Sequence, residues 1–110
     1  MYYIILLHIC GINDSRCRKL VRMVEDVVDQ ALGQALRKLR TERGWSQSDL
    51  ALRAEMDRNY LSLIELGRNS PSVRMLLRLC QALDVRATTV LDDVERRMLV
   101  LENKQRTKRG

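Results

Sequence analysis

Histidine, proline and cysteine are scarce in this chain, whose 110 residues include one histidine, one proline and three cysteines. The cysteines Cys10, Cys17 and Cys80 are odd in number and form no CxxC pair, so neither a disulfide framework nor a zinc site is expected. His8 is the lone histidine, no glycine-rich phosphate loop occurs, and no set of nucleophile and base has catalytic spacing. We therefore expect no enzyme, no metal and no cofactor, and a reducing cytoplasm as the compartment.

A long hydrophobic run is also missing. The N-terminal segment "MYYIILLHICGI" is apolar, but about a dozen residues are too few to span a bilayer. It lacks the basic region and the small-residue cleavage site of a signal peptide. We expect no membrane partner. The segment is an edge strand, a surface packed on a partner, or an upstream extension if the natural start is Met23.

Positive charge predominates. Lys and Arg number 20 against 14 Asp and Glu, which gives a formal charge of +6 and a pI near 9.7. Such a surface attracts polyanions at modest salt, which favours nucleic acid as a partner. A solvated basic surface that binds nothing would have the same composition. A chain of this length can bury an ordinary core and leaves no room for a second, catalytic domain.

Apolar residues recur every three or four positions, and no strand alternation follows residue 12. The pattern predicts an all-α fold, a compact bundle of about five helices with an N-terminal extension. The first apolar stripe covers residues 16–43 and fits one long helix or two helices with a break near Gly33. Gly44 is the expected stop.

Capping residues divide the remaining chain. Ser46 is an expected N-cap, with Asp49 three residues later in nearly a capping-box arrangement, and it begins a helix of about eight residues. Asp57 is the next expected N-cap, so only about three residues separate this short helix from the following one. Ser72 begins a fourth helix, and a fifth is expected to start near Ala87.

The last helix carries an apolar seam with heptad spacing, formed by Leu91, Val94, Met98 and Leu101. Two interpretations remain open for it: a homodimer seam, or core packing of an ordinary terminal helix. The tail, residues 102–110, is basic and polar and is expected to be disordered.

Two short helices joined by a three-residue turn are typical of a helix-turn-helix, whose second helix enters the major groove. Ala51 is small where the two helices would approach most closely. Arg58, Asn59 and Leu63 lie on the outward face of the expected recognition helix, residues 58–66. Arg can bond guanine, Asn can bond adenine, and an apolar side chain can meet a thymine methyl group.

The stretch from residue 32 to residue 85 resembles the lambda-repressor-like helix-turn-helix family, also called the Cro or xenobiotic-response-element type. The resemblance covers about half of the chain. It is carried by separated elements in the family order: Leu-Arg pairs in the first helix, Ser46-Gln47, Leu50-Ala51, Leu61-Ser62, Ile64-Glu65, Gly67, Pro71-Ser72, Leu76 and Leu83. The resemblance implies a sequence-specific transcriptional regulator that binds double-stranded DNA, as a homodimer on a two-fold operator.

The resemblance also implies residue roles. Base edges would be contacted by Arg58, Asn59 and Leu63. Phosphates would be contacted by Gln47, Tyr60, Arg68 and Asn69. Arg40 and Glu65 match a family ion pair that ties the first helix of the family domain to its third, so their role would be structural.

The chain also departs from the family pattern. Glu55 stands in the turn where many members have glycine, and a left-handed backbone there would cost about 1 kcal/mol. Residues 1–22 and about the last dozen match nothing in the family. We therefore divide the chain into an extension (1–22), a helix-turn-helix domain (23–101) and a basic tail (102–110).

Three narrower functions share these features. Controller proteins of restriction-modification systems and antitoxins are similar stand-alone domains, and gene neighbours would separate them. A protein-interaction module that no longer reads DNA is a third alternative, with the apolar N-terminus and the heptad seam docking an unknown protein partner. The basic charge, together with Arg58 and Asn59 on the outward face, favours a DNA-binding protein of the cytoplasm that associates with the nucleoid.

Overall fold

Five α-helices make up the part of the chain that our computed structural model describes, residues 15–109, with side-chain surroundings described for residues 25–104. They are α2 (Ser15–Glu42), α3 (Gln47–Arg53), α4 (Arg58–Glu65), α5 (Val73–Leu83) and α6 (Ala87–Arg109), and no strand occurs among these residues. The expected all-α bundle of about five helices is confirmed. The N-terminal apolar segment, with its edge-strand alternative and with His8 and Cys10, lies outside the described residues.

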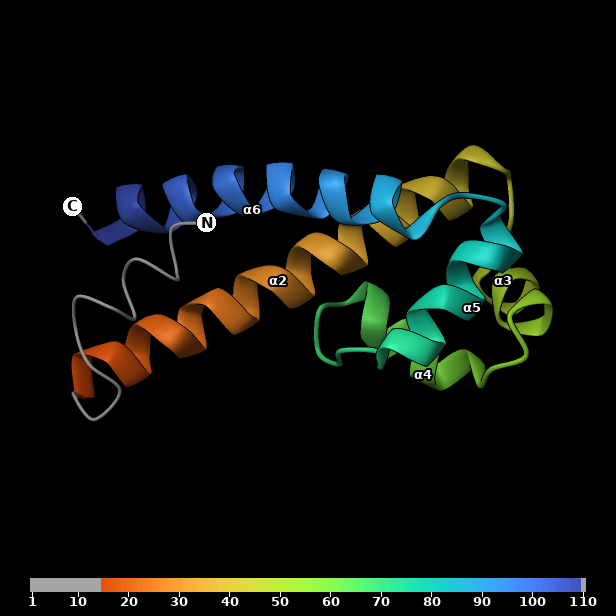
Figure 1. The fold of residues 1–110 in the computed structure, drawn as a ribbon, viewed down its shortest axis with the longest axis horizontal. Coiled ribbons are helices and arrows are strands. Elements are labelled where there is room, and N and C mark those ends of the chain that lie inside the picture. The colour runs from red at the N-terminus through yellow and green to blue at the C-terminus, as the bar shows by residue number, and fades with distance from the viewer. Residues whose placement is uncertain (1–14, 110) are drawn as a thin grey trace.

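Two long helices and three short ones form an elongated molecule of 43 × 26 × 24 Å. Figure 1 shows α3, α4 and α5 gathered at one end of the long axis, around the end of α2 and the beginning of α6. The first turns of α2 and the last turns of α6 lie at the opposite end (Figure 1). None of the described helices is long and apolar enough to cross a membrane.

Helix α2 passes through Gly33 without a break, so the alternative of two helices is wrong. Gly44 terminates helix α2, as expected. Gly44 has a φ of +70° and its N–H donates to Thr41 O at 3.0 Å, while Trp45 N donates to Arg40 O at 3.2 Å. These paired bonds satisfy the last carbonyls of the helix in the manner of a Schellman motif, which requires a left-handed residue.

The N-cap of α3 is a complete capping box. Ser46 Oγ accepts from Asp49 N at 3.1 Å, and Ser46 N donates to Asp49 Oδ2 at 2.9 Å. The backbone N–H of Ser46 is the main reason that the pKa of Asp49 lies below its ordinary value. Because the folded pKa is depressed, the stabilisation from this carboxylate is present above the unfolded pKa and is lost as the pH falls through the folded value.

Acid should therefore remove the contribution of Asp49. The melting temperature of Asp49→Ala is expected to lie below that of the wild type at neutral pH, and the gap is expected to narrow below about pH 4 as the wild-type carboxylate is protonated. Thermal melts of both proteins between pH 7 and pH 2.5 would measure it. A gap that stays constant through the acid range would contradict this account.

The other two expected N-caps are also confirmed. Asp57 Oδ1 accepts from Asn59 N at 2.6 Å, and Ser72 Oγ accepts from Met75 N at 3.2 Å. Helix α6 starts at Ala87, as expected. Side-chain oxygens at these positions satisfy N–H groups that the first turn of a helix leaves without a partner, which fixes where α4 and α5 begin.

The core is a single cluster to which all five helices contribute buried residues. Its largest fully buried side chains are Leu36, Leu50, Leu61, Ile64, Leu79, Leu83, Val27 and Val90. Ala51 is 3% exposed, in agreement with its expected place between α3 and α4. Cys80, expected as a small core residue, is 2% exposed, and burial raises the pKa of its thiol.

Two of the four residues in the apolar seam of α6 are buried within their own chain. Val94 and Met98 are 4% and 8% exposed and belong to the core of their own chain, with Leu101 packed against it. Leu91, by contrast, is 44% exposed. The physical reason is that heptad spacing presents one apolar stripe to any antiparallel or parallel neighbour, and α2 of the same chain fills that place. The four residues therefore do not form an exposed stripe for a second copy.

The expectation that the basic tail is disordered is wrong, because α6 continues to Arg109. Glu, Lys, Gln and Arg, which dominate "ENKQRTKR", are all good helix formers, and the polar composition that suggested disorder is compatible with a solvated helix end. The predicted division between residues 22 and 23 falls inside α2.

Candidate nucleic-acid interface

Helices α3 and α4 form a helix-turn-helix, with residues 54–57 between them. Ala54 caps α3 and Asp57 caps α4, so two residues remain to reverse the chain. Glu55 takes the left-handed conformation, with a φ of 54°, and Met56 N donates to Ala51 O at 2.9 Å across the turn. The turn therefore demands from Glu55 the conformation that glycine adopts most easily.

Replacing Glu55 with glycine is expected to stabilise the protein by about 1 kcal/mol, because glycine carries no steric penalty at positive φ. Urea unfolding of Glu55→Gly and Glu55→Ala would measure it. Alanine keeps the β-carbon and should bring no such gain. If alanine stabilised the protein as much as glycine, the carboxylate rather than the backbone would be the source of the penalty.

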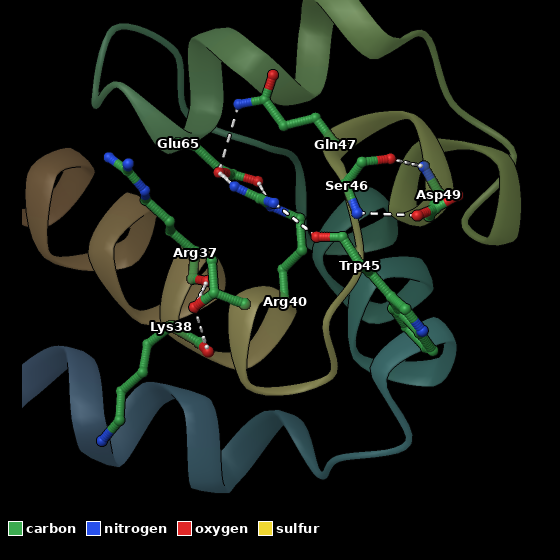
Figure 2. A network of polar contacts seen from close by, with 9 residues as sticks. Arg37, Lys38, Arg40, Trp45, Ser46, Gln47, Asp49 and Glu65 are labelled. Atoms are coloured by element: carbon green, nitrogen blue, oxygen red, sulfur yellow. Dashed lines mark hydrogen bonds and ion pairs between the residues drawn. The ribbon is translucent and has the colours of Figure 1, made fainter.

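One carboxylate ties three helices together behind the turn. Glu65 of α4 accepts from Arg40 of α2 twice, Nε to Oε2 at 2.8 Å and Nη2 to Oε1 at 2.9 Å. Gln47 of α3 donates from Nε2 to the same Oε1 at 3.4 Å. Figure 2 shows both side chains converging on Glu65. The side chains of Arg40 and Glu65 are 11% and 3% exposed, so solvent screens this bidentate pair only weakly.

Arg40 has a second partner, since its Nη1 donates to Trp45 O at 2.7 Å (Figure 2). Trp45 immediately precedes Ser46, the N-cap of α3. One guanidinium therefore holds the chain that enters α3 and the end of α4 at the same time. The ion pair that the family resemblance implied is present, and it fixes α4 relative to both α2 and α3.

Two glycines bring α4 close to α2, and sequence reasoning missed this role. A β-carbon on Gly33 would lie 2.5 Å from Ile64 O and 2.6 Å from Glu65 O. A β-carbon on Gly67, whose φ is +75°, would lie 3.1 Å from the Cα of Gln30. The end of α4 and the loop after it therefore rest on the backbone of α2. A glycine in a long helix without a break was the only signal in the sequence.

The outer surface of α4 carries the predicted base-contacting residues. Arg58 and Asn59 are exposed in its first turn, and no side-chain hydrogen bond or ion pair engages either one within the described part of the chain. Leu63 is 40% exposed one turn further on. Tyr60 is half-buried and packs against the core. Arg58, Asn59 and Leu63 are thus exposed on a helix whose opposite side is fixed to α2 by the Arg40–Glu65 pair.

The loop that follows α4 carries two of the predicted phosphate contacts. Arg68 is exposed, and Asn69 is half-buried, with its Oδ1 accepting from Ser70 N at 2.9 Å. Burial raises the pKa of Asp29 on α2, partly offset by a hydrogen bond from the Ser70 side chain. The loop therefore lies against α2, which Gly67 also approaches closely at Gln30. The other two predicted phosphate contacts are half-buried: Gln47 at the start of α3 and Tyr60 on α4.

No group of three or more side chains that could hold a metal ion occurs among the residues whose surroundings are described. What the site offers is an exposed helix flanked by a loop and by the start of α3. This is the arrangement in which a helix-turn-helix protein inserts one helix into the major groove and braces it with flanking backbone contacts.

Comparisons with known proteins agree with this geometry. A family model described as helix-turn-helix matches residues 36–90, which is half of the chain. The chain belongs to this family of helix-turn-helix proteins, of the xenobiotic-response-element type. Several relatives that this chain resembles bear the name HTH-type transcriptional regulator.

Three relatives illustrate the range of the family. The HTH-type transcriptional regulator SinR of Bacillus subtilis is 38% identical over 63 residues, 56% of this chain and 57% of SinR. The crystal structure of the clp gene regulator ClgR from Corynebacterium glutamicum has a TM-score of 0.69 at 30% identity, covering 74% of this chain and 87% of that one. The restriction-modification controller protein C.Esp1396I, solved as a tetramer with its natural 35 base-pair operator, has a TM-score of 0.60 at 25% identity, covering 66% and 95%. The chain thus spans little more than half the length of SinR.

Proposed function

We propose that this protein is a sequence-specific DNA-binding transcriptional regulator that acts in the cytoplasm on two-fold operators. The observation that carries the proposal is the exposed first turn of α4. There the side chains of Arg58 and Asn59 make no hydrogen bond or ion pair within the described chain, while Glu65 at the other end of the helix is held by Arg40. A helix fixed at its end and free on its outer face is suited to direct readout. The relatives that are regulators, and one solved with its operator, support the same function.

Site selection followed by titration tests the proposal. The purified protein would be used to select duplexes from a random pool, and the selected site and a scrambled duplex would be titrated by fluorescence anisotropy at two salt concentrations. A specific regulator should bind its selected site at least about a thousandfold more tightly than the scrambled duplex. Failure to enrich any site would leave only non-specific binding and would refute sequence-specific regulation.

Arg58→Ala and Asn59→Ala are each expected to weaken binding to the selected site by about 1–3 kcal/mol and to relax specificity at one position. Their binding to scrambled DNA should change much less, because base contacts contribute little there. Arg96→Ala, which removes an exposed arginine from α6, is the matched control and should leave the specificity ratio unchanged. Equal losses on both duplexes for Arg58→Ala would contradict base readout.

The homodimer is part of the proposal, because one recognition helix reads only a few base pairs and paired half-sites raise both affinity and specificity. Of the predicted seam, Leu91 and Leu101 would be available to the interface, whereas Val94 and Met98 are buried within the chain. The controller protein solved as a tetramer on DNA supports assembly on the operator.

A controller function in a restriction-modification system is the second candidate, and a methyltransferase or nuclease gene beside this one would support it.

A further inference from the structure

A polar cleft lies between the end of α3 and the second half of α5, two helices that contact each other (Figure 1). Its volume is about 320 Å³, and its lining residues are Arg53, Ala54, Glu55, Arg78, Gln81 and Ala82. The two alanines are buried or half-buried, whereas the four longer side chains are exposed. Small side chains therefore leave the space open, and exposed polar side chains line it. We call it the α3–α5 cleft.

Arg53 is held in place within this lining. Its guanidinium carbon lies 4.1 Å from the centroid of the Trp45 ring, which is the distance of a cation–π contact. The side chain of Arg53 makes no hydrogen bond or ion pair among residues 25–104, so its N–H groups are available to an external acceptor. A group that is already ordered loses less conformational freedom when a ligand binds.

Arg78 and Glu55 add one further charge of each sign. Neither side chain makes a hydrogen bond or ion pair with another residue whose surroundings the structure describes. Glu55 has a left-handed backbone, with a φ of 54°, in which a non-glycine residue is strained. Strained residues cluster at functional sites, where the use of the side chain offsets the strain. The lining thus offers two cations, one anion and the amide of Gln81, and its net charge is positive.

We propose that the α3–α5 cleft binds a small organic anion. Arg53 and Arg78 hold its oxyanion group, a carboxylate or a phosphate, because a guanidinium binds both kinds of oxyanion through two parallel N–H groups. Glu55 accepts from a donor on the same ligand, which favours a ligand that also carries an ammonium or hydroxyl group. Small-molecule sites have volumes of about 300–1,000 Å³, so this cleft fits a ligand of amino-acid size better than a nucleotide cofactor.

This site goes beyond the proposed function, because none of its lining residues is a predicted DNA contact. Gln47, a predicted phosphate contact, is the first residue of α3, whereas Arg53 is the last. Anion binding can therefore be measured without DNA. A protein that selects no duplex could still bind the anion, and a protein that binds no anion could still select a duplex, so the two proposals fail separately.

NMR titration of the isotope-labelled full chain tests the site, at a constant ionic strength maintained with chloride. Three probes are used: inorganic phosphate, L-glutamate and glutarate, which is L-glutamate without its ammonium group. Saturable shifts are expected for the backbone amides of residues 53–55 and 78–82 and for the indole N–H of Trp45. The tighter of phosphate and L-glutamate identifies the oxyanion. L-Glutamate should bind more tightly than glutarate, since only L-glutamate offers an ammonium donor to Glu55.

Three outcomes would contradict this account. The absence of a saturable shift in these residues with any probe would overturn the proposal. Shifts confined to Gln47, Arg68 and Asn69 would also overturn it, because the anions would then occupy the positions where DNA phosphates are expected. Equal binding of L-glutamate and glutarate would overturn the part assigned to Glu55.

Two variants and a matched control test the lining. Arg78→Gln should weaken binding of the tighter probe about tenfold, because it removes charge-assisted hydrogen bonds. Ala82→Leu should abolish binding by filling the cleft. The control, Arg86→Gln, removes the same charge from an exposed arginine outside the cleft and should change the affinity less than about twofold. Equal weakening by the two arginine variants would mean a general attraction to positive charge and would overturn the proposal. Circular dichroism melts establish that all three variants fold.

Discussion

Gly33→Ala is expected to destabilise the protein by about 3 kcal/mol, although the same change inside an ordinary helix stabilises by about 1 kcal/mol. The reversal follows from the position of α4. A β-carbon on Gly33 would lie 2.5 Å from Ile64 O and 2.6 Å from Glu65 O, and both are backbone atoms that cannot rotate away. Relief requires α4 to move away from α2. Operator affinity should therefore fall together with stability.

Gly44→Ala is the matched control for this prediction. Gly44 has a φ of +70° and no atom within 4 Å of an added β-carbon, so alanine meets backbone strain there without a clash. A loss of about 1 kcal/mol is expected. Urea unfolding of the two variants measures the difference. A loss at Gly33 no larger than that at Gly44 would mean that α4 yields easily and that its close approach to Gly33 does not position it.

Arg40→Met is expected to cost about 3 kcal/mol, because it leaves the Glu65 carboxylate buried without its cation. The side chain of Glu65 is 3% exposed, so water cannot replace the guanidinium. The double variant with Glu65→Met should recover at least half of the loss, since an apolar pair leaves no buried charge. A double-mutant cycle of unfolding free energies measures the coupling.

A surface pair supplies the control for the buried one. Arg96 and Asp92 of α6 form an ion pair at 2.8 Å, as close as that of Arg40 and Glu65, but their side chains are 77% and 62% exposed. Arg96→Met should cost less than about 1 kcal/mol, because solvent screens exposed pairs. If the two arginine variants lost similar stability, burial would not be what makes Arg40 important.

Local chemistry was predictable from the sequence. Ser46, Asp57 and Ser72 act as N-caps, and Gly44 ends α2, because capping depends on the residue and its near neighbours in the chain. The order of these signals, together with the family motif, was enough to predict the helix-turn-helix and the all-α fold. The left-handed backbone of Glu55 followed from its place in the family pattern.

Distant contacts were not predictable in the same way. Gly33 suggested a break because glycine disfavours a helix, whereas its reason is an α4 backbone about thirty residues further along the chain. The seam of α6 suggested a second chain because a heptad pattern specifies a neighbour and does not specify which one. In both cases the sequence indicates that a partner is needed and only the tertiary structure identifies it.

The unbroken helix α2 has a mechanical consequence. At about 1.5 Å per residue, its 28 residues form a stiff rod about 42 Å long, and α4 rests on it at Gly33.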